Sequence, residues 1–262
     1  KQLHKELKNN NISFRPEIWI SDDWFSPDGH PGFAIPFYLF TPQLISLENF
    51  YTQEVEGYTR PELMKLLRHE TAHAMDNAFG LRMDKRRQKL FGLCSVPYPK
   101  DYLPNKKSNN FVTNLSDFYA QSHPEEDFAE TFAVWLDPGS NWQKRYISKP
   151  VALEKLLFID QLMHKLKSKK EKLITAPPPD QLRNLKGNLR DYYLRKRKRL
   201  GIIGLIDIQK DLHKIFTNKV ESKKTVQAAK LIKTGNKILK DSFLKKKSSE
   251  GIKVKNKLIK NL

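Results

Sequence analysis

Residues 59–83 read TRPELMKLLRHETAHAMDNAFGLRM and contain a strong helix signal. Thr59 and Glu62 are spaced as a capping box, and Pro61 suits the first turn of a helix. The pattern therefore predicts a helix that begins at Thr59 and continues to about Met83. Because a helix turns by about 100° per residue, side chains three or four positions apart in this segment lie on one face.

Within this helix, residues 69–73 form the arrangement HExxH. His69 and His73 lie one turn apart on one face, so both imidazoles can reach a single metal ion. Glu70 is rotated by about 100° from His69, beside the metal, where its carboxylate can take a proton from metal-bound water. A catalytic zinc requires a third protein ligand, and the position six residues after His73 holds Phe79, so that ligand must come from elsewhere. The alternative is a pair of surface histidines on a capped helix.

Ser122 to Glu125 repeat the capping-box spacing, with Ser122 as the cap, and predict a second helix from Pro124 to about Leu136, within the run SHPEEDFAETFAVWLDPG at residues 122–139. Its Glu126 and Glu130 are four residues apart on one face, which suits one metal ligand and one acceptor that orients a histidine. The alternative is an acidic first turn in solvent, which the helix dipole favours. That alternative explains the other acidic residues of the first turn, but it explains Glu130, deeper in an apolar stretch, poorly.

Three further segments and one histidine complete the secondary-structure prediction. The run 32–40 is strand-like, and Pro36 within it argues for an edge strand. Residues 94–112 carry several prolines and polar residues and are predicted to form a long surface loop. Residues 153–172 are predicted to form a helix with a basic end. His123, at the start of the second helix, is expected to cap or pack rather than bind substrate.

Four motifs resemble the bacterial family of putative zinc-binding metallopeptidases: WFSPDG at 24–29, IPFYL at 35–39, LRHETAHA at 67–74 and YAQSHPEEDFAETFAVWL at 119–136. The resemblance covers about residues 18–163. It implies an α+β, zincin-like metalloprotease domain in which a small mixed sheet with an edge strand accompanies two active-site helices. The family is named from its motif, so the resemblance implies a fold and a site and no particular substrate.

A more distant likeness to the glutamate zincins, or gluzincins, implies a role for individual residues. These proteins, which include the anthrax lethal-factor type, take the third zinc ligand from a glutamate on a later helix, which matches Glu126 beside His69 and His73. In the lethal-factor type, a tyrosine seven residues before that glutamate assists at the oxyanion. This position is Tyr119, for which a buried structural role is the alternative. Thermolysin-like relatives place an acidic residue four positions after the ligand, which matches Glu130.

The activity implied by the resemblance is Zn²⁺-dependent hydrolysis of a peptide or protein, with Glu70 as general base and then general acid. In zincins an edge strand beside the active helix holds an extended peptide by strand addition, and the run 32–40 is the candidate for that role. The rival function is that of a catalytically inactive zinc-binding protein that binds nucleic acid or an anionic envelope or membrane surface. The presence of both Glu70 and a correctly spaced Tyr119 favours the enzyme.

The net charge of +19 is concentrated at one end of the chain. Residues 180–262 hold 24 Lys and Arg against 7 Asp and Glu, whereas residues 1–179 hold 24 against 22. A run of three prolines separates the two parts. We therefore predict a metallopeptidase domain at residues 1–175, a proline linker at 176–179 and a basic helical extension at 180–262.

Three interpretations of the basic extension compete. The run Arg195, Lys196, Arg197, Lys198 and Arg199 can contact the phosphates of nucleic acid without sequence specificity. The extension can instead bind an anionic membrane or cell-envelope polymer. The third interpretation is a solvated helical appendage on the surface of the enzyme. Aliphatic residues beyond Lys219 recur at roughly helical spacing, which favours helix there.

Composition excludes two classes of protein. No stretch approaches the roughly 18 apolar residues that a membrane-spanning helix needs, so an integral membrane protein is not expected. Cys94 is the single cysteine, which excludes a disulfide framework and a multi-cysteine metal site. The single cysteine fits a reducing compartment, and we expect a cytoplasmic protein. The chain begins with lysine, so a signal peptide cannot be judged from it.

Overall fold

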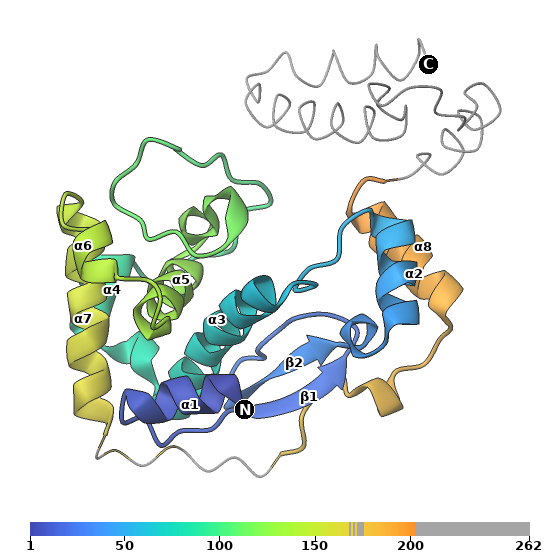
Figure 1. The fold of residues 1–262 in the computed structure, drawn as a ribbon, viewed down its shortest axis with the longest axis horizontal. Helices are drawn as coiled ribbons and strands as arrows, with labels where there is room; N and C mark the ends of the chain where they lie inside the picture. Colours follow the sequence, from blue (N-terminus) through green and yellow to red (C-terminus); the bar gives the residue numbers. More distant parts are fainter. Residues whose placement is uncertain (168, 170, 172–175, 203–262) are drawn as a thin grey trace. The chain divides into compact units, whose positions relative to one another are not determined.

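The computed structural model describes residues 1–167, 169, 171 and 176–202. The chain divides into two units, Lys1–Leu189 and Arg190–Leu262. The first unit contains, in chain order, α1 (Gln2–Asn9), β1 (Glu17–Ser21), β2 (Gly32–Pro36), the 3-10 helix η1 (Phe37–Phe40), α2 (Pro42–Thr52), α3 (Arg60–Phe79), η2 (Leu81–Met83), α4 (Lys85–Phe91), η3 (Ser116–Gln121), α5 (Pro124–Leu136), α6 (Trp142–Arg145), α7 (Pro150–Leu166) and η4 (Leu182–Asn184) (Figure 1). This unit is a helix-rich α+β domain, the class that the sequence predicts.

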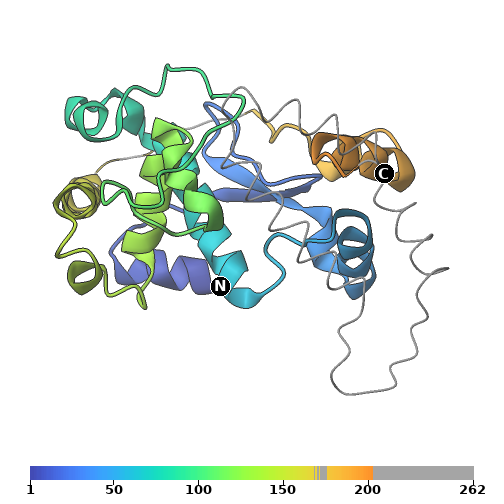
Figure 2. The same cartoon turned by 90° about the horizontal axis from the view of Figure 1, so that it is seen from above.

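The central elements of the first unit are layered in the order α7, α5, α3 and sheet, as Figures 1 and 2 show from two directions. Helix α3 packs against both α5 and β2, and α5 also packs against α7. Ala72 of α3 and Ala129 and Ala133 of α5 are fully buried. Small side chains at buried positions let helix backbones approach closely. The layering therefore brings the two helices with the predicted metal ligands into direct contact.

The sheet differs in two respects from the small mixed sheet that the sequence predicts. In the described part of the chain it consists of β1 and β2, which pair in parallel, and antiparallel pairing is limited to one bridge between Phe25 and Ala34. The strand predicted over residues 32–40 ends at Pro36, and η1 follows it. Proline has no N–H to continue a ladder of hydrogen bonds, which explains why the strand stops there.

The bridge at Phe25 occupies part of the outer side of β2. The Ala34 N–H donates to the carbonyl oxygen of Phe25 at 2.8 Å. The connection between β1 and β2 therefore covers the outer side of β2 at Ala34. The predicted edge position is confirmed for β2, which is one of two strands in the described sheet, but its outer side is not free at Ala34.

Helix α3 begins as the sequence predicts and ends earlier. The capping box forms, with the Thr59 hydroxyl accepting from the Glu62 N–H and the Glu62 carboxylate accepting from the Thr59 N–H. The helix ends at Phe79 instead of about Met83, because Gly80 adopts a left-handed conformation with φ 64°. Glycine adopts this conformation without steric cost and commonly ends helices.

Helix α5 spans Pro124–Leu136 as predicted, but its cap differs from the expected one. The N-cap residue is His123, whose Nδ1 accepts from the Glu125 N–H at 3.2 Å. The Ser122 hydroxyl donates to the carbonyl oxygen of Tyr119 instead. The capping role expected of His123 is thereby confirmed, and a hydroxyl cap at Ser122 is wrong.

Helix α7 and the long loop are close to their predictions. The helix begins at Pro150, three residues before the predicted start, because proline suits the first turn. It ends at Leu166, and part of the predicted continuation to residue 172 lies outside the described residues. Residues 94–112 contain no helix or strand, which confirms the predicted loop. No helix in the described ranges is long and apolar enough to cross a membrane.

The described part of the second unit consists mainly of α8 (Leu189–Arg199), which contains the predicted anion-contacting run. Two members of that run are buried: Lys196, whose Nζ donates to the Tyr192 hydroxyl, and Arg197, which donates to the carbonyl oxygen of Ile202. These two side chains are therefore poorly placed to contact phosphates. The aliphatic positions predicted to form helix beyond Lys219 lie outside the described residues.

Candidate metal centre

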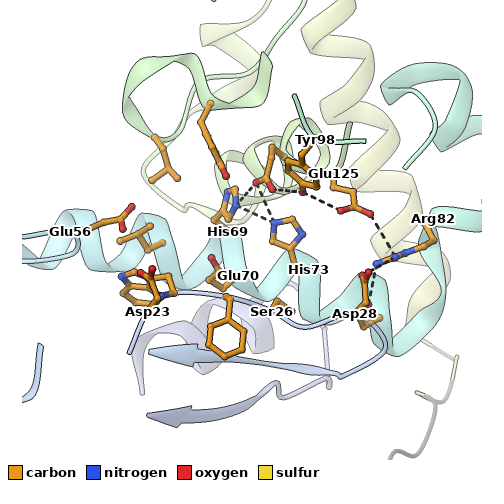
Figure 3. A pocket seen from close by; sticks show the side chains of 17 residues that line it. Asp23, Ser26, Asp28, Glu56, His69, Glu70, His73, Arg82, Tyr98 and Glu125 are labelled. Atoms are coloured by element: carbon orange, nitrogen blue, oxygen red, sulfur yellow. Dashed lines mark hydrogen bonds and ion pairs between the residues drawn. The ribbon is translucent and has the colours of Figure 1, made fainter. Parts of the chain in front are cut away.

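Three side chains from α3 and α5 converge at the contact between these helices. His69 and His73 come from one face of α3, and Glu126 comes from the first turn of α5. One ligand atom from each side chain lies within 4.8 Å of the other two. The structure thus brings together the three residues for which the sequence and the resemblance imply metal binding, and Figure 3 shows both histidines directed to one point.

The distances between the three ligand atoms fit a tetrahedral zinc site. Glu126 Oε2 lies 3.0 Å from His69 Nε2 and 3.4 Å from His73 Nε2, and the two Nε2 atoms are 3.2 Å apart. Zinc–ligand bonds of about 2.0 Å in a tetrahedron separate neighbouring ligand atoms by about 3.3 Å. Glu126 Oε2 is buried and has no hydrogen-bond partner among the described residues. Two imidazoles and one carboxylate are also a ligand set that zinc prefers.

Glu130 fixes the orientation of His69 from the opposite side. Its Oε1 lies 2.9 Å from His69 Nδ1, and its side chain is completely buried. The backbone N–H groups of Asn114 and Leu115 and the Asn114 side-chain amide donate to the same carboxylate. These donors fix the position of the Glu130 carboxylate, so that Oε1 can accept the Nδ1 proton of His69 and leave the Nε2 lone pair for a metal.

The electrostatics of the centre favour a positive charge between the three ligands. Burial by itself lowers the pKa of His69, but the neighbouring carboxylates of Glu126 and Glu130 raise that pKa well above its ordinary value. Burial by itself raises the pKa of Glu126, but His69 and His73 bring that pKa well below the usual range. Both shifts arise because carboxylates and imidazoles face one another, and a divalent cation between the three side chains would balance the same negative charge.

A cavity is lined by the three candidate ligands, and Glu70, the residue after His69 on α3, also faces this cavity (Figure 3). Its side chain is buried, and burial is the main cause that raises its pKa, while the nearby histidines oppose the rise. A carboxylate with a raised pKa is a better proton acceptor near neutral pH. The position and environment of Glu70 suit a general base.

Tyr119 lies at the wall of the cavity and comes from η3, just before α5. Its ring centroid is 5.8 Å from that of His69. Burial, together with the charges of Glu126 and Glu70, raises the pKa of its phenol above the ordinary value. The phenol therefore stays protonated and can donate a hydrogen bond.

The cavity beside these residues has a volume of about 330 Å³. The segment that connects β1 to β2 contributes several of its walls: Asp23, Trp24, Phe25, Ser26 and Asp28. At one end, Arg82 joins Asp28 at 3.0 Å and Glu125 at 3.6 Å (Figure 3). The cavity is large enough for several side-chain or backbone groups of a peptide, and it opens directly onto Glu70.

Sequence reasoning missed Tyr98, which contacts the candidate metal ligand. Its hydroxyl lies 2.7 Å from Glu126 Oε1 and 3.1 Å from Glu125 Oε2. Burial and the charge of Glu126 raise the pKa of Tyr98, so its phenol is neutral and donates. The residue lies in the loop 94–112, where no helical or strand periodicity places a side chain, and the only local signal is its position between Pro97 and Pro99. The backbone donors of Asn114 and Leu115 were missed for the same reason.

The alternative of an acidic first turn in solvent is wrong for α5. Asp127 is buried, and its Oδ2 accepts from Lys155 Nζ at 2.6 Å. Burial raises the pKa of Asp127 to about 7, although the charge of Lys155 opposes the rise. Glu125 has only 14% of its side chain exposed and faces Tyr98 and Arg82. The acidic residues of this turn are therefore part of buried networks.

Comparison with known families adds one finding. Residues 53–146 match the family model described as "Putative zinc-binding metallo-peptidase". The matched segment contains α3, α5 and the three candidate ligands, and it confirms the family resemblance over residues 53–146, which include the motifs at 67–74 and 119–136. Zinc is thus the metal indicated both by the family and by the ligand set. Neither the curated proteins nor the solved structures yield a match.

Proposed function

We propose that this protein is a zinc-dependent metallopeptidase of the glutamate-zincin type, with His69, His73 and Glu126 as zinc ligands. The observation that carries the proposal is the convergence of these three ligand atoms beside the buried Glu70 in one cavity. A metal with a purely structural role needs neither an adjacent buried base nor an open cavity. These two features favour an enzyme over a catalytically inactive zinc-binding protein.

Each residue of the site has a distinct task in peptide hydrolysis. A zinc ion held by His69, His73 and Glu126 would supply Lewis acidity, which lowers the pKa of water and polarises a substrate carbonyl. Glu70 accepts the proton of the attacking water and later delivers it to the leaving amine. Tyr119 donates its phenol O–H to the carbonyl oxygen as that atom gains negative charge. Glu130 keeps His69 in the tautomer that binds metal through Nε2.

The substrate in this proposal is an extended peptide that lies along residues 23–26. These partly buried residues line the cavity, whereas the outer side of β2 is already paired with Phe25 at Ala34. A peptide can pair with a segment that lines a cavity through main-chain hydrogen bonds, and side-chain pockets then give specificity. In this proposal the connection between β1 and β2, instead of the run 32–40, pairs with the substrate peptide.

Metal content and hydrolysis, measured together, test the proposal. Elemental mass spectrometry of the wild type should give about one zinc per chain, and His73→Ala should retain little. Glu70→Gln should keep its zinc and lose about 10²–10⁴-fold of the rate of cleavage of a mixed peptide library. A wild type without stoichiometric zinc after zinc supplementation contradicts the metal site. Unchanged cleavage by Glu70→Gln contradicts the mechanism.

A further inference from the structure

Tyr98 lies outside both predicted helices and yet makes the shortest hydrogen bond to the side chain of Glu126. Its hydroxyl donates to Oε1 at 2.7 Å, whereas the other oxygen, Oε2, is the one directed to His69 and His73. The two oxygens of one carboxylate therefore face different partners. One faces the two histidines, and the other is occupied by the loop.

The loop is attached to α5 by contacts that fix the Tyr98 ring. The ring stacks on the imidazole of His123, with centroids 3.7 Å apart and planes at 15°. The same imidazole donates from Nε2 to the carbonyl oxygen of Val96 at 2.8 Å, while its Nδ1 caps α5. Pro97 and Pro99 restrict the backbone on either side of the tyrosine. The phenol is thus held by the helix that supplies Glu126.

The carboxylate of Glu125 is a second possible acceptor for the Tyr98 hydroxyl. The two carboxylates differ in their distance from the hydroxyl and in their other partners. Glu125 Oε2 is 3.1 Å from the Tyr98 hydroxyl, which has a single proton to donate. Glu125 already faces the Arg82 guanidinium at 3.6 Å. The shorter distance to Glu126 indicates that the proton is directed to the candidate ligand.

We propose that Tyr98 is a positioning residue for the zinc site, which holds Glu126 so that a single oxygen binds the metal. A carboxylate with two free oxygens can rotate or bind through both, and the second oxygen would then occupy the coordination position that catalytic water needs. The hydrogen bond to Oε1 prevents this. This inference rests on the proposed function, because it assigns Glu126 as a zinc ligand.

The experiment compares two Tyr→Phe variants from the same loop. Tyr98→Phe removes the hydroxyl and keeps the ring that stacks on His123. Tyr102→Phe is the matched control, because its hydroxyl contacts the carbonyl oxygen of Asp117 and no candidate ligand. Zinc affinity is measured by competition with a chromophoric chelator, and thermal unfolding of the metal-free proteins shows whether either variant alters the fold.

We expect Tyr98→Phe to weaken zinc binding by about 10–100-fold, the usual cost of losing a partner of a ligand. Tyr102→Phe should bind zinc as the wild type does, and the unfolding temperature of metal-free Tyr98→Phe should match that of the wild type. X-ray absorption of the zinc-loaded Tyr98→Phe protein should show an additional oxygen at the metal. Peptide hydrolysis should lose kcat with little change in KM.

Three results overturn the inference, and they are distinguishable. Wild-type zinc affinity in Tyr98→Phe, while His73→Ala has lost zinc, overturns the role of Tyr98 alone and leaves the proposed function intact. Failure of the wild type to bind zinc overturns both. An equal loss of zinc affinity in Tyr102→Phe also contradicts the proposal, because the effect would then belong to the loop as a whole.

Discussion

The two buried faces of α5 hold their carboxylates in different ways. On the face toward α3, Glu126 and Glu130 lie against the imidazoles of His69 and His73. On the face toward α7, Asp127 pairs with Lys155, whose Nζ also donates to the carbonyl oxygen of Asn110. A buried carboxylate needs a cation or several donors to offset its lost hydration. The face toward α7 has a permanent cation, the ammonium of Lys155. The face toward α3 has a position between its ligands for a metal cation that can exchange.

This difference separates stability from chemistry on a single helix. The lysine cannot leave, so the face toward α7 is complete when the chain folds. On the face toward α3, the carboxylate oxygen Oε2 of Glu126 is buried. It has no hydrogen-bond partner in the described part of the chain. We therefore expect substitutions on the first face to change the free energy of unfolding and substitutions on the second to change metal binding.

The largest expected effect is on the face toward α7. Lys155→Met leaves Asp127 buried without its cation, and breaking a buried pair costs about 3–5 kcal/mol of the free energy of unfolding. Chemical denaturation above pH 7, where Asp127 with its pKa of about 7 is ionised in the wild type, measures this loss. The folded fraction of the variant should bind zinc with wild-type affinity, because the pair does not contact the metal ligands.

A double variant provides the control for this pair. Asp127→Leu combined with Lys155→Met replaces the pair with apolar side chains, which is often neutral or stabilising. The double variant should therefore be more stable than Lys155→Met alone. If Lys155→Met unfolds at the wild-type denaturant concentration, the contrast between the two faces is wrong.

A smaller effect is expected on the face toward α3. Glu130→Gln keeps the shape of the side chain but removes the charge that accepts the His69 Nδ1 proton, so zinc affinity should fall by about 10–100-fold. Chelator competition measures the affinity. Equal zinc affinity in Glu130→Gln and wild type would show that His69 does not depend on Glu130 for its orientation.

The smallest effect is expected from loss of the N-cap of α5. This change affects both faces of the helix, because it destabilises the start of α5 itself. His123→Ala removes the N-cap, which costs about 0.5–2 kcal/mol of the free energy of unfolding. His123→Asn supplies a side chain that caps well and should restore most of this stability. Thermal unfolding of the two metal-free variants makes the comparison. Equal unfolding temperatures for Ala and Asn would contradict the capping role.

The parts of the site that local spacing controls could be predicted from the sequence. The HExxH arrangement requires only that residues 59–79 form a helix, and the capping box at Thr59 forms as expected. The bounds of α5 follow in the same way, because Pro124 suits its first turn and a proline and a glycine follow its end. The pairing of Glu126 with the two histidines came from the resemblance, since helical periodicity does not say which helices meet.

The other contacts of the site depend on packing between segments that are distant in the sequence. The phenol of Tyr98, the backbone donors of Asn114 and Leu115 and the ammonium of Lys155 reach α5 from loops or from another helix. The bridge at Phe25, which covers β2, likewise depends on how the connection between the strands folds back. Helix caps and side-chain faces depend on neighbours within a few residues, and so they can be predicted from the sequence. The partners of a buried charge are whatever groups the fold brings within hydrogen-bond distance, and only the tertiary structure specifies them.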